Sequence, residues 1–397
     1  MSRRGRLDAV IVGGGVVGCA AALALARQGL EVALLEAQAP AAWSADKRDL
    51  RVYAFAPDNA ALLDSVGAWR GVREARLQPY RRMRVWDAAG GGELTFDADT
   101  LARAELGWIV EHGLLVDRLW NALPGAGVRV HAPARAEDIE QHDDGVRVRL
   151  DDGRTLDARV LLAADGAESA VRAMAGFETQ RHDYAQKGVV AYVASERPHD
   201  DTAWQRFLPT GPLALLPCTR GESGEHMGSI VWTLPDAEAE RVLALDAQAF
   251  GIELTNAFED TLGALTLYSN RAAFPLRRQL ANEYAKGRVL LLGDAAHVVH
   301  PLAGQGVNLG LRDVSALAKS IEEANARRID WTAPHRLARW ARTRRSENAT
   351  NAHAFSAINA LFSNDDMATT LLRGPLLGLA GKVPPLAHAL WKHAAGV

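Results

Sequence analysis

A glycine-rich turn near the N-terminus constrains the fold of this chain more than any other feature. Residues 7–12 are apolar and predict a buried strand, and the sequence GGGVVG follows directly at residues 13–18. Residues 19–28, rich in Ala and Leu, predict a helix, and residues 31–35 predict a second strand that closes on Glu36. Because this order of elements is a βαβ unit, the sequence predicts an α/β fold with a Rossmann-like domain at its start.

The residues of this unit match the contacts that a bound dinucleotide requires. Gly13 permits a tight turn, Gly15 lets the backbone approach a pyrophosphate, and Gly18 allows the helix to pack closely on the strand. Glu36 can accept both hydroxyls of an adenosine ribose, a residue that a turn without a ligand does not explain. We therefore expect a dinucleotide site, although this pattern does not distinguish FAD from NAD.

A second glycine-rich stretch lies far along the chain, at residues 289–310. Four aliphatic residues predict a strand, a loop punctuated by Gly and Pro follows, and a helical pattern resumes near Gly306. A helix start has unpaired N–H groups and partial positive charge, and Gly304 and Gly306 leave the backbone uncovered. The stretch predicts a place where a large planar anion lies against backbone; an ordinary strand-to-helix connection is the alternative.

Two weaker signals lie between these stretches. An apolar strand at residues 160–164 runs into Asp165 and Gly166, and Ser169 follows at the expected start of a helix. That segment alone fits a turn with a helix cap as well as it fits a ligand site. Arg51, in a charged loop, could reach back to a pyrophosphate or could equally be solvated.

The middle of the chain changes pattern. From about residue 183 to 282, apolar segments alternate with polar turns, which predicts a mainly antiparallel β-sheet substrate domain that interrupts the dinucleotide domain. A hairpin around three glycines, near residue 91, joins it. The predicted boundaries are 1–80, 111–182 and 283–325 for the dinucleotide domain, 81–110 for the hairpin, 183–282 for the substrate domain and 326–397 for a C-terminal helical region.

Composition narrows the class of protein. The net charge of -3 over 397 residues argues against a nucleic-acid binder. Cys19 and Cys218 are the only cysteines, which suggests neither a disulfide framework nor a cysteine metal site and fits a reducing cytoplasm. The uncharged run at residues 9–26 could be mistaken for a membrane span, but glycines cut it. The apolar tail at 371–391 is expected to pack onto the body, with contact at the inner membrane face as an alternative.

Three segments, at residues 13–18, 165–172 and 293–313, together resemble the flavoprotein aromatic hydroxylases, the single-component, p-hydroxybenzoate hydroxylase-like (class A) monooxygenases. The sequence HPLAGQGVNLG at residues 300–310 is similar to the form found in ring hydroxylases of ubiquinone biosynthesis. The segments GPLALLP at 211–217 and SIVW at 229–232 are similar to that group too. The resemblance covers the chain from about residue 7 to the tail.

The resemblance implies a reaction and its partners. FAD would be the cofactor, NADPH or NADH the electron donor, and O₂ the oxidant, with a flavin hydroperoxide transferring oxygen to an electron-rich ring. The substrate would be a prenylated phenol or quinol precursor, and a ubiquinone-biosynthesis complex is a potential partner. The protein would position the ring, exclude water and tune the flavin electrostatically.

The resemblance also implies roles for particular residues. Asp294 would accept a hydrogen bond from a ribityl hydroxyl, with turn capping as its alternative, and Pro301 would place a carbonyl beside the flavin ring. His300 would lie near the reacting edge, where it either polarises a substrate phenol or serves the structure. The expected cofactor-binding residues are Gly13, Gly15, Gly18, Glu36, Arg51, Asp165, Gly293, Asp294, Pro301, Gly304, Gly306, Val307 and Asn308. The expected pocket wall is Leu213, Leu215, Pro217 and Val231.

Two further features bear on these roles. His297 and His300 have i, i+3 spacing, but no third ligand is apparent and no metal is expected. Family members often carry Arg or another polar residue after the Glu equivalent to Glu111, whereas this chain has His112 followed by Gly113. A flavin contact from that helix is therefore open.

Other functions remain open at this point. The same chemistry could act on a small soluble aromatic, or the chain could be a flavin-bound subunit of a lipid-biosynthetic complex without turnover. A flavin-dependent prenyl reductase is less favoured, because the GDAAH and GQGVN sequences fit hydroxylases better.

Overall fold

A parallel sheet forms the base of the molecule in the computed structural model, which describes residues 6–88, 92–299 and 305–362. Strand β1 (Leu7–Val12) is central and pairs in parallel with β11 (Thr155–Ala163) and β2 (Val32–Leu35). Strands β19 (Val289–Leu291) and β8 (Arg129–His131) extend the parallel part on either side. This arrangement confirms the Rossmann-like domain, and β11 contains most of the strand predicted at residues 160–164.

Antiparallel strands complete this eight-stranded sheet. β18 pairs with β19 at one edge, and β10 pairs with the first residues of β11 and with β9. Their bounds are Ala136–Gln141 for β9, Val146–Leu150 for β10 and Ala285–Lys286 for β18.

Helix α1 (Val16–Ala26) explains the long uncharged run of the sequence. It is buried on nearly every side because it lies between the sheet and helices α8 (Gln305–Ala326) and α4 (His112–Ala122). The run at residues 9–26 is thus a strand, a turn and a helix of the core, as the glycines indicated. In the part of the chain that the structure describes, no helix is long and apolar enough to cross a membrane.

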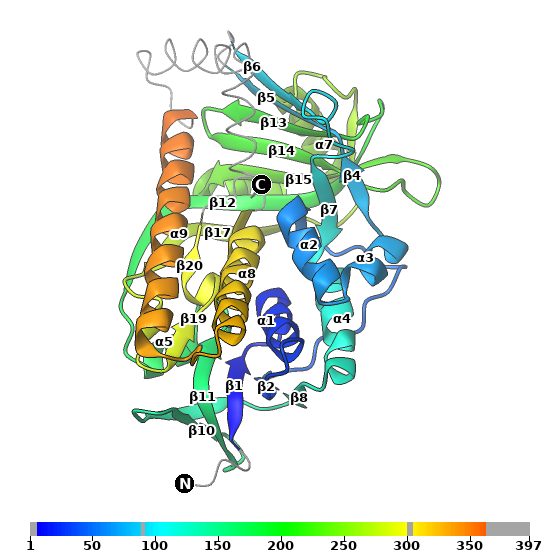
Figure 1. Cartoon of the computed structure of the whole chain (residues 1–397). Helices are drawn as coiled ribbons and strands as arrows, with labels where there is room; N and C mark the ends of the chain where they lie inside the picture. The colour runs from blue at the N-terminus through cyan, green and yellow to red at the C-terminus, as the bar shows by residue number, and fades with distance from the viewer. Residues whose placement is uncertain (1–5, 89–91, 300–304, 363–397) are drawn as a thin grey trace.

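A nine-stranded, mainly antiparallel sheet lies above this body (Figure 1). Its longest member is β12, and β5 pairs in parallel with β13, which attaches the predicted hairpin to the sheet. The strands, in spatial order, are β20 (His297–Val298), β17 (Ala272–Ala281), β12 (Thr179–Ser195), β15 (His226–Pro235), β14 (Gly211–Pro217), β13 (Thr202–Leu208), β5 (Arg82–Asp87) and β6 (Glu93–Asp97), with β16 (Leu265–Leu267) beside β12.

The two faces of the antiparallel sheet have different neighbours. Helices α6 (Asp236–Ala244) and α7 (Ala247–Ala257) cover one face and close a second hydrophobic core over it. Because side chains alternate between faces along a strand, the intervening residues point toward the α/β body. The sheet therefore inserts between segments of the Rossmann-like domain, as predicted; the exact domain boundaries remain predictions.

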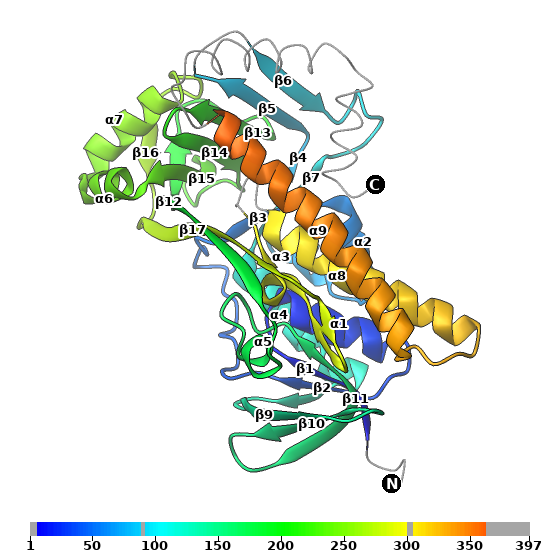
Figure 2. The same cartoon turned by 90° about the vertical axis from the view of Figure 1, so that its left-hand side faces the viewer.

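The remaining elements connect the α/β body to the antiparallel sheet. A three-stranded sheet lies between them, and helix α9 runs along the side of the molecule from the lower sheet to the upper one (Figure 2). The bounds are β3 (Val52–Phe55), β4 (Gln78–Tyr80), β7 (Gly107–Glu111), α2 (Pro57–Ser65), α3 (Trp69–Ala75), α5 (Ala170–Met174), α9 (Pro334–Phe362), and the 3₁₀ turns η1 (Pro124–Ala126) and η2 (Gly293–Ala295).

Candidate functional site

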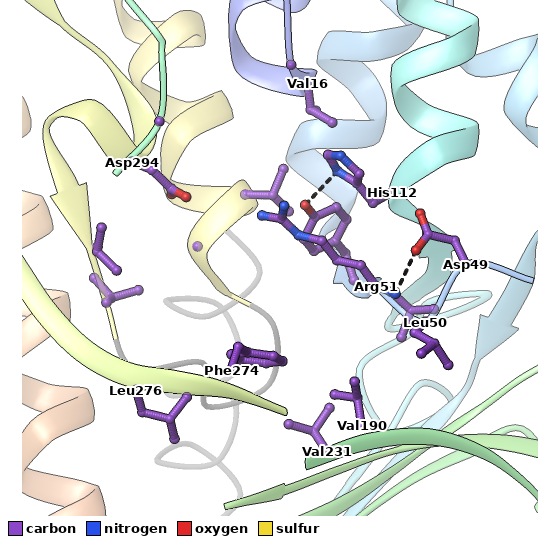
Figure 3. A pocket seen from close by; sticks show the side chains of 18 of the residues that line it. Val16, Asp49, Leu50, Arg51, His112, Val190, Val231, Phe274, Leu276 and Asp294 are labelled. Atoms are coloured by element: carbon purple, nitrogen blue, oxygen red, sulfur yellow. Dashed lines mark hydrogen bonds between the residues drawn. The ribbon is translucent and has the colours of Figure 1, made fainter. Parts of the chain in front are cut away.

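A cavity of about 710 Å³ lies where the carboxyl ends of the parallel strands meet the inner face of the antiparallel sheet (Figure 3). Open α/β sheets bind their ligands at this edge, and the volume is that of a ligand site. One wall carries Gly15, Gly166 and Asp294 from the α/β body, and another carries Val190 and Val231 from the sheet.

Gly13, Gly15 and Gly18 of the first turn have distinct environments. A Cβ atom at Gly13, whose φ is +108°, would lie 2.3 Å from the carbonyl oxygen of Ala164. A Cβ atom at Gly18 would lie 1.9 Å from the carbonyl oxygen of Gly13. Close packing therefore requires glycine at both positions. A Cβ at Gly15 would meet nothing within 4 Å, and Gly15 lines the cavity. Only Gly15 leaves its space to a ligand.

Glu36 is tied to the same turn. Its Oε2 atom accepts a hydrogen bond from the backbone N–H of Gly14 at 2.5 Å, and its Oε1 atom accepts one from Gln38 at 3.0 Å. The carboxylate follows β2 directly and is half-buried. Each carboxylate oxygen has a further lone pair, so the group retains capacity to accept a hydroxyl.

The second glycine-rich stretch packs against the first turn of helix α1. Gly293 has a φ of +57°, and a Cβ at Gly310 would lie 2.7 Å from Cγ2 of Val17, which shows how closely α8 approaches α1. Gly306 and Val307, in the first turn of α8, line the cavity, and a Cβ at Gly306 would meet nothing within 4 Å. This helix start therefore presents open backbone to the cavity.

The carboxylates of Asp294 and Asp165 have different surroundings. Asp294 lines the cavity with its carboxylate directed inward, and no described residue donates a hydrogen bond to that carboxylate (Figure 3). Asp165 instead accepts from Ser169 Oγ at 2.5 Å and from the N–H of Val171 at 3.1 Å. The side chain of Asp165 thus caps the turn into α5, the structural alternative left open by the sequence, and only its neighbours Ala164 and Gly166 reach the cavity.

The structure also corrects the prediction that the side chain of Asn308 binds the cofactor. Its side chain is fully buried: Oδ1 accepts from Ala56 at 3.0 Å and from Asn59 at 2.9 Å, and Nδ2 donates to Ala54 at 2.8 Å. The amide fastens α8 to the segment between β3 and α2. A cofactor contact at residue 308 is therefore left to the backbone.

Strand β3 and the start of α4 form the wall opposite Asp294 (Figure 3). The Arg51 guanidinium lies over the ring of Tyr53, 5.6 Å from its centroid, and the Tyr53 hydroxyl is 2.9 Å from Nδ1 of His112. Burial and the nearby Arg51 lower the pKa of His112 to about 4, and burial raises the pKa of Tyr53. The departure from the family at residue 112 thus places a neutral imidazole on the cavity wall, a role that the sequence did not reveal.

Two carboxylates anchor the loop that carries Arg51: the half-buried Asp49 and the buried Glu111. Asp49 accepts from the N–H of Gly113 at 2.9 Å and from the N–H of Arg51 at 2.9 Å. Glu111 accepts from the N–H of Asp49 at 3.3 Å and pairs with Arg76 at 2.7 Å. Arg51, which lines the cavity, is therefore held in place from the start of α4.

The sheet wall corrects the predicted pocket residues. Val231 lines the cavity, but Leu213 and Leu215 are fully buried in the core beneath α6 and α7, and Pro217 is not among the lining residues. Alternation along β14 turns Ala214 and Leu216 to the cavity instead. The sequence prediction chose the larger apolar residues, and these occupy the core face.

Behind the Gly293 loop lies a buried polar cluster that sequence reasoning did not find. Asp313 accepts hydrogen bonds from His297 at 2.6 Å, from the N–H of Gly293 at 3.1 Å and from Arg344 at 2.8 Å. His297 is completely buried, so it serves this cluster rather than a ligand. The predicted residues His300, Pro301 and Gly304 lie outside the described residues.

The protein-family comparison agrees with this geometry. A family model described as "FAD binding domain" matches residues 6–355. The chain belongs to this family. The glycines around the cavity fit an FAD molecule because Gly15 and Gly306 leave space where any side chain would intrude. The FAD cofactor expected from the sequence is thereby confirmed.

The relatives of this FAD-binding-domain protein include hydroxylases. It is 37% identical over 393 residues to the ubiquinone hydroxylase UbiL of Rhodospirillum rubrum, covering 98% of this chain and 89% of that protein. It is 34% identical over 392 residues to 3-demethoxyubiquinol 3-hydroxylase of Escherichia coli, covering 98% of each. The resemblance to flavoprotein hydroxylases of the ubiquinone group is confirmed.

Solved structures share the fold. The crystal structure of p-nitrophenol 4-monooxygenase PnpA from Pseudomonas putida superposes with a TM-score of 0.76, at 20% identity and with 98% of each chain covered. Because the sequence identity is only 20%, this similarity establishes the fold alone, a Rossmann-like body with an inserted sheet.

Proposed function

We propose that this protein hydroxylates the aromatic ring of a prenylated phenol or quinol in ubiquinone biosynthesis, with FAD, O₂ and either NADPH or NADH. The observation that carries the proposal is one continuous cavity. It reaches from the glycine turns and Asp294 to an apolar sheet face that includes Val190, Val231 and Phe274. The named activities of the two hydroxylases similar to this chain support the pathway.

FAD, when bound, supplies electron transfer to O₂ and delivery of one oxygen atom to the ring. The backbone at Gly13 and Gly15 would lie along the pyrophosphate, and Glu36 would accept the ribose hydroxyls. Asp294, whose carboxylate accepts no hydrogen bond from a described residue, would accept one from the ribityl chain. Pro301 and His300 remain predictions for the reacting edge.

The first turn of α8 would stabilise negative charge on the reduced ring system, because Gly306 and Val307 at this helix N-terminus line the cavity. Arg51 adds positive charge to the opposite wall. The apolar sheet face would exclude water, which otherwise diverts reduced oxygen to H₂O₂. These residues bind, orient and shield; the described cavity requires no nucleophilic side chain.

Association with a ubiquinone-biosynthesis complex and contact with a membrane surface are part of the proposal. The sequence similarity to ubiquinone-pathway hydroxylases supports both, since a prenylated substrate is lipid-soluble.

An Asp294→Ala variant tests the cofactor site, with the exposed Asp64→Ala on α2 as its matched control. The proposal predicts that Asp294→Ala loses retained FAD and hydroxylation together, while Asp64→Ala keeps both. Full flavin content and turnover in Asp294→Ala would refute the assigned role.

Comparing substrates tests the pathway. Flavin reduction and oxygen consumption are followed with a prenylated phenol and with a hydroxybenzoate. Preference for the prenylated phenol supports the proposal, and preference for the water-soluble acid would favour the hydroxylase of a small aromatic. Rescue of a cell lacking its own copy by Asp294→Ala would favour a subunit without turnover.

A further inference from the structure

One transverse row of side chains crosses the sheet wall of the cavity. The register of the strands aligns one residue from each of five neighbours, and all five line the cavity: Gln205 of β13, Ala214 of β14, Val231 of β15, Val190 of β12 and Ala272 of β17. The row is apolar except at Gln205. Thr233 of β15, two residues beyond Val231, adds a hydroxyl on the same face.

Gln205 is a buried polar side chain on the cavity wall. It is 7% exposed, and its amide makes no hydrogen bond with any residue that the structure describes. Its neighbours face away: Arg206 donates to the carbonyl of Ala257 at 2.7 Å, and Trp204 packs against the core under α6 and α7. Strand alternation therefore directs Gln205 into the cavity.

Thr233 is placed similarly. It is 2% exposed, and its hydroxyl has no hydrogen-bond partner within the described ranges. Both residues line the cavity, where a bound molecule with matching groups would hydrogen-bond the amide and the hydroxyl. Two such groups on an otherwise apolar wall indicate a ligand-binding feature rather than a packing one.

The sheet wall carries little net charge. Arg277 is the one charged side chain among its described lining residues, and its guanidinium is bonded to Glu168. An amide both donates and accepts, and so does a hydroxyl. The two groups therefore match neutral oxygens, such as a phenol hydroxyl, a methoxy oxygen or a quinol oxygen.

A neighbouring position shapes the same wall. A Cβ atom at Gly188 would lie 3.1 Å from two ring atoms of Phe274, so the absence of a side chain lets that ring lie over β12. Phe274 lines the cavity (Figure 3). The wall thus combines a flat aromatic surface with two hydrogen-bonding groups.

We propose that Gln205 and Thr233 are positioning residues that hydrogen-bond the oxygen substituents of a neutral aromatic substrate and so fix the orientation of its ring. This inference rests on the proposed function and assigns the side of the site that selects the substrate. Discrimination arises because an analogue that lacks an oxygen substituent leaves the group that would bind it unpaired.

The test uses flavin-loaded holoenzyme with two prenylated phenols, one carrying a ring methoxy group and one lacking it. The variants are Gln205→Leu, Thr233→Val and the conservative Thr233→Ser, with Gln248→Leu on the exposed surface of α7 as control. Substrate dissociation constants, kcat/KM and the fraction of O₂ released as H₂O₂ are measured. Flavin content and the thermal midpoint report folding.

Gln205→Leu and Thr233→Val are each expected to lower kcat/KM for the methoxy substrate by about tenfold and to raise its dissociation constant. They should change the values for the other substrate far less and release more H₂O₂. Thr233→Ser and Gln248→Leu should resemble the wild type. Equal losses on both substrates, or none, with normal flavin content would overturn the inference. Wild-type protein that hydroxylates neither phenol would overturn the proposed function instead.

Discussion

His297 and Asp313 form a completely buried pair, with Nε2 of the imidazole 2.6 Å from Oδ2 of the carboxylate. The same carboxylate accepts from the N–H of Gly293, from Arg344 and from Asn348. Although burial alone would raise it, His297 and Arg344 hold the pKa of Asp313 below its usual value. The pair thereby links α9 to the loop that presents Asp294 to the cavity.

The first prediction concerns this cluster. Asp313→Asn removes the buried charge that pairs with Arg344, which is only 4% exposed and would keep only its ion pair with the exposed Glu347. We expect the free energy of unfolding to fall by about 3–5 kcal/mol, the cost of breaking a buried ion pair. Urea unfolding of the apoprotein measures it, with the exposed Asp64→Asn as control. A loss no larger than that of the control would contradict the structural role.

A second prediction separates two glycines of one turn. Gly15→Val should leave the free energy of unfolding within about 1 kcal/mol of wild type, because its side chain enters open space. It should nevertheless weaken FAD binding, which flavin fluorescence titration measures. Gly18→Val should cost about 1–3 kcal/mol or more, because its Cβ meets the backbone of Gly13. The reverse pattern would show that the turn does not face the cofactor as assigned.

A third prediction uses the titration of His112. Its pKa in the folded protein is lowered to about 4, so the unfolded chain binds its proton first as pH falls. The residue therefore costs no stability above about pH 6.5, and its cost grows between pH 6.5 and 4, reaching about 3 kcal/mol at most. His112→Gln should lose less stability than wild type over that interval. Parallel pH profiles of unfolding would exclude the buried, neutral imidazole.

A fourth prediction distinguishes the two faces of β14. Leu213→Ala should lower the free energy of unfolding by about 2–5 kcal/mol, because it opens a hole in the core under α6 and α7. Ala214→Leu fills cavity space, so it should raise KM for the phenol with little change in stability. Thermal unfolding and steady-state kinetics check the pair. A kinetic effect at residue 213 without loss of stability would restore the original pocket prediction.

Strong local patterns made much of this fold predictable. The βαβ unit, the strand before Gly293 and the start of α8 follow from apolar runs punctuated by glycine. The inserted sheet follows from alternation. Such patterns depend on neighbours in sequence, so they survive without knowledge of the tertiary structure.

The site was less predictable where side chains had a choice of partners. Asp165 and Asn308 satisfy nearby backbone groups instead of facing the cavity. The phase of the alternation in β14 depends on α6 and α7, which contact the other face. Tyr53, His112 and Gln205 come from strands and a helix far apart in sequence, and only the fold brings them to one cavity.

Incubation of the purified, FAD-loaded protein with NADPH or NADH, a prenylated phenol and isotopically labelled O₂ tests the central claim most directly. The account predicts a hydroxylated product that carries one labelled oxygen atom by mass spectrometry, with little H₂O₂. Protein that binds no FAD, or that reduces O₂ only to H₂O₂ in the presence of every phenol tested, would contradict it.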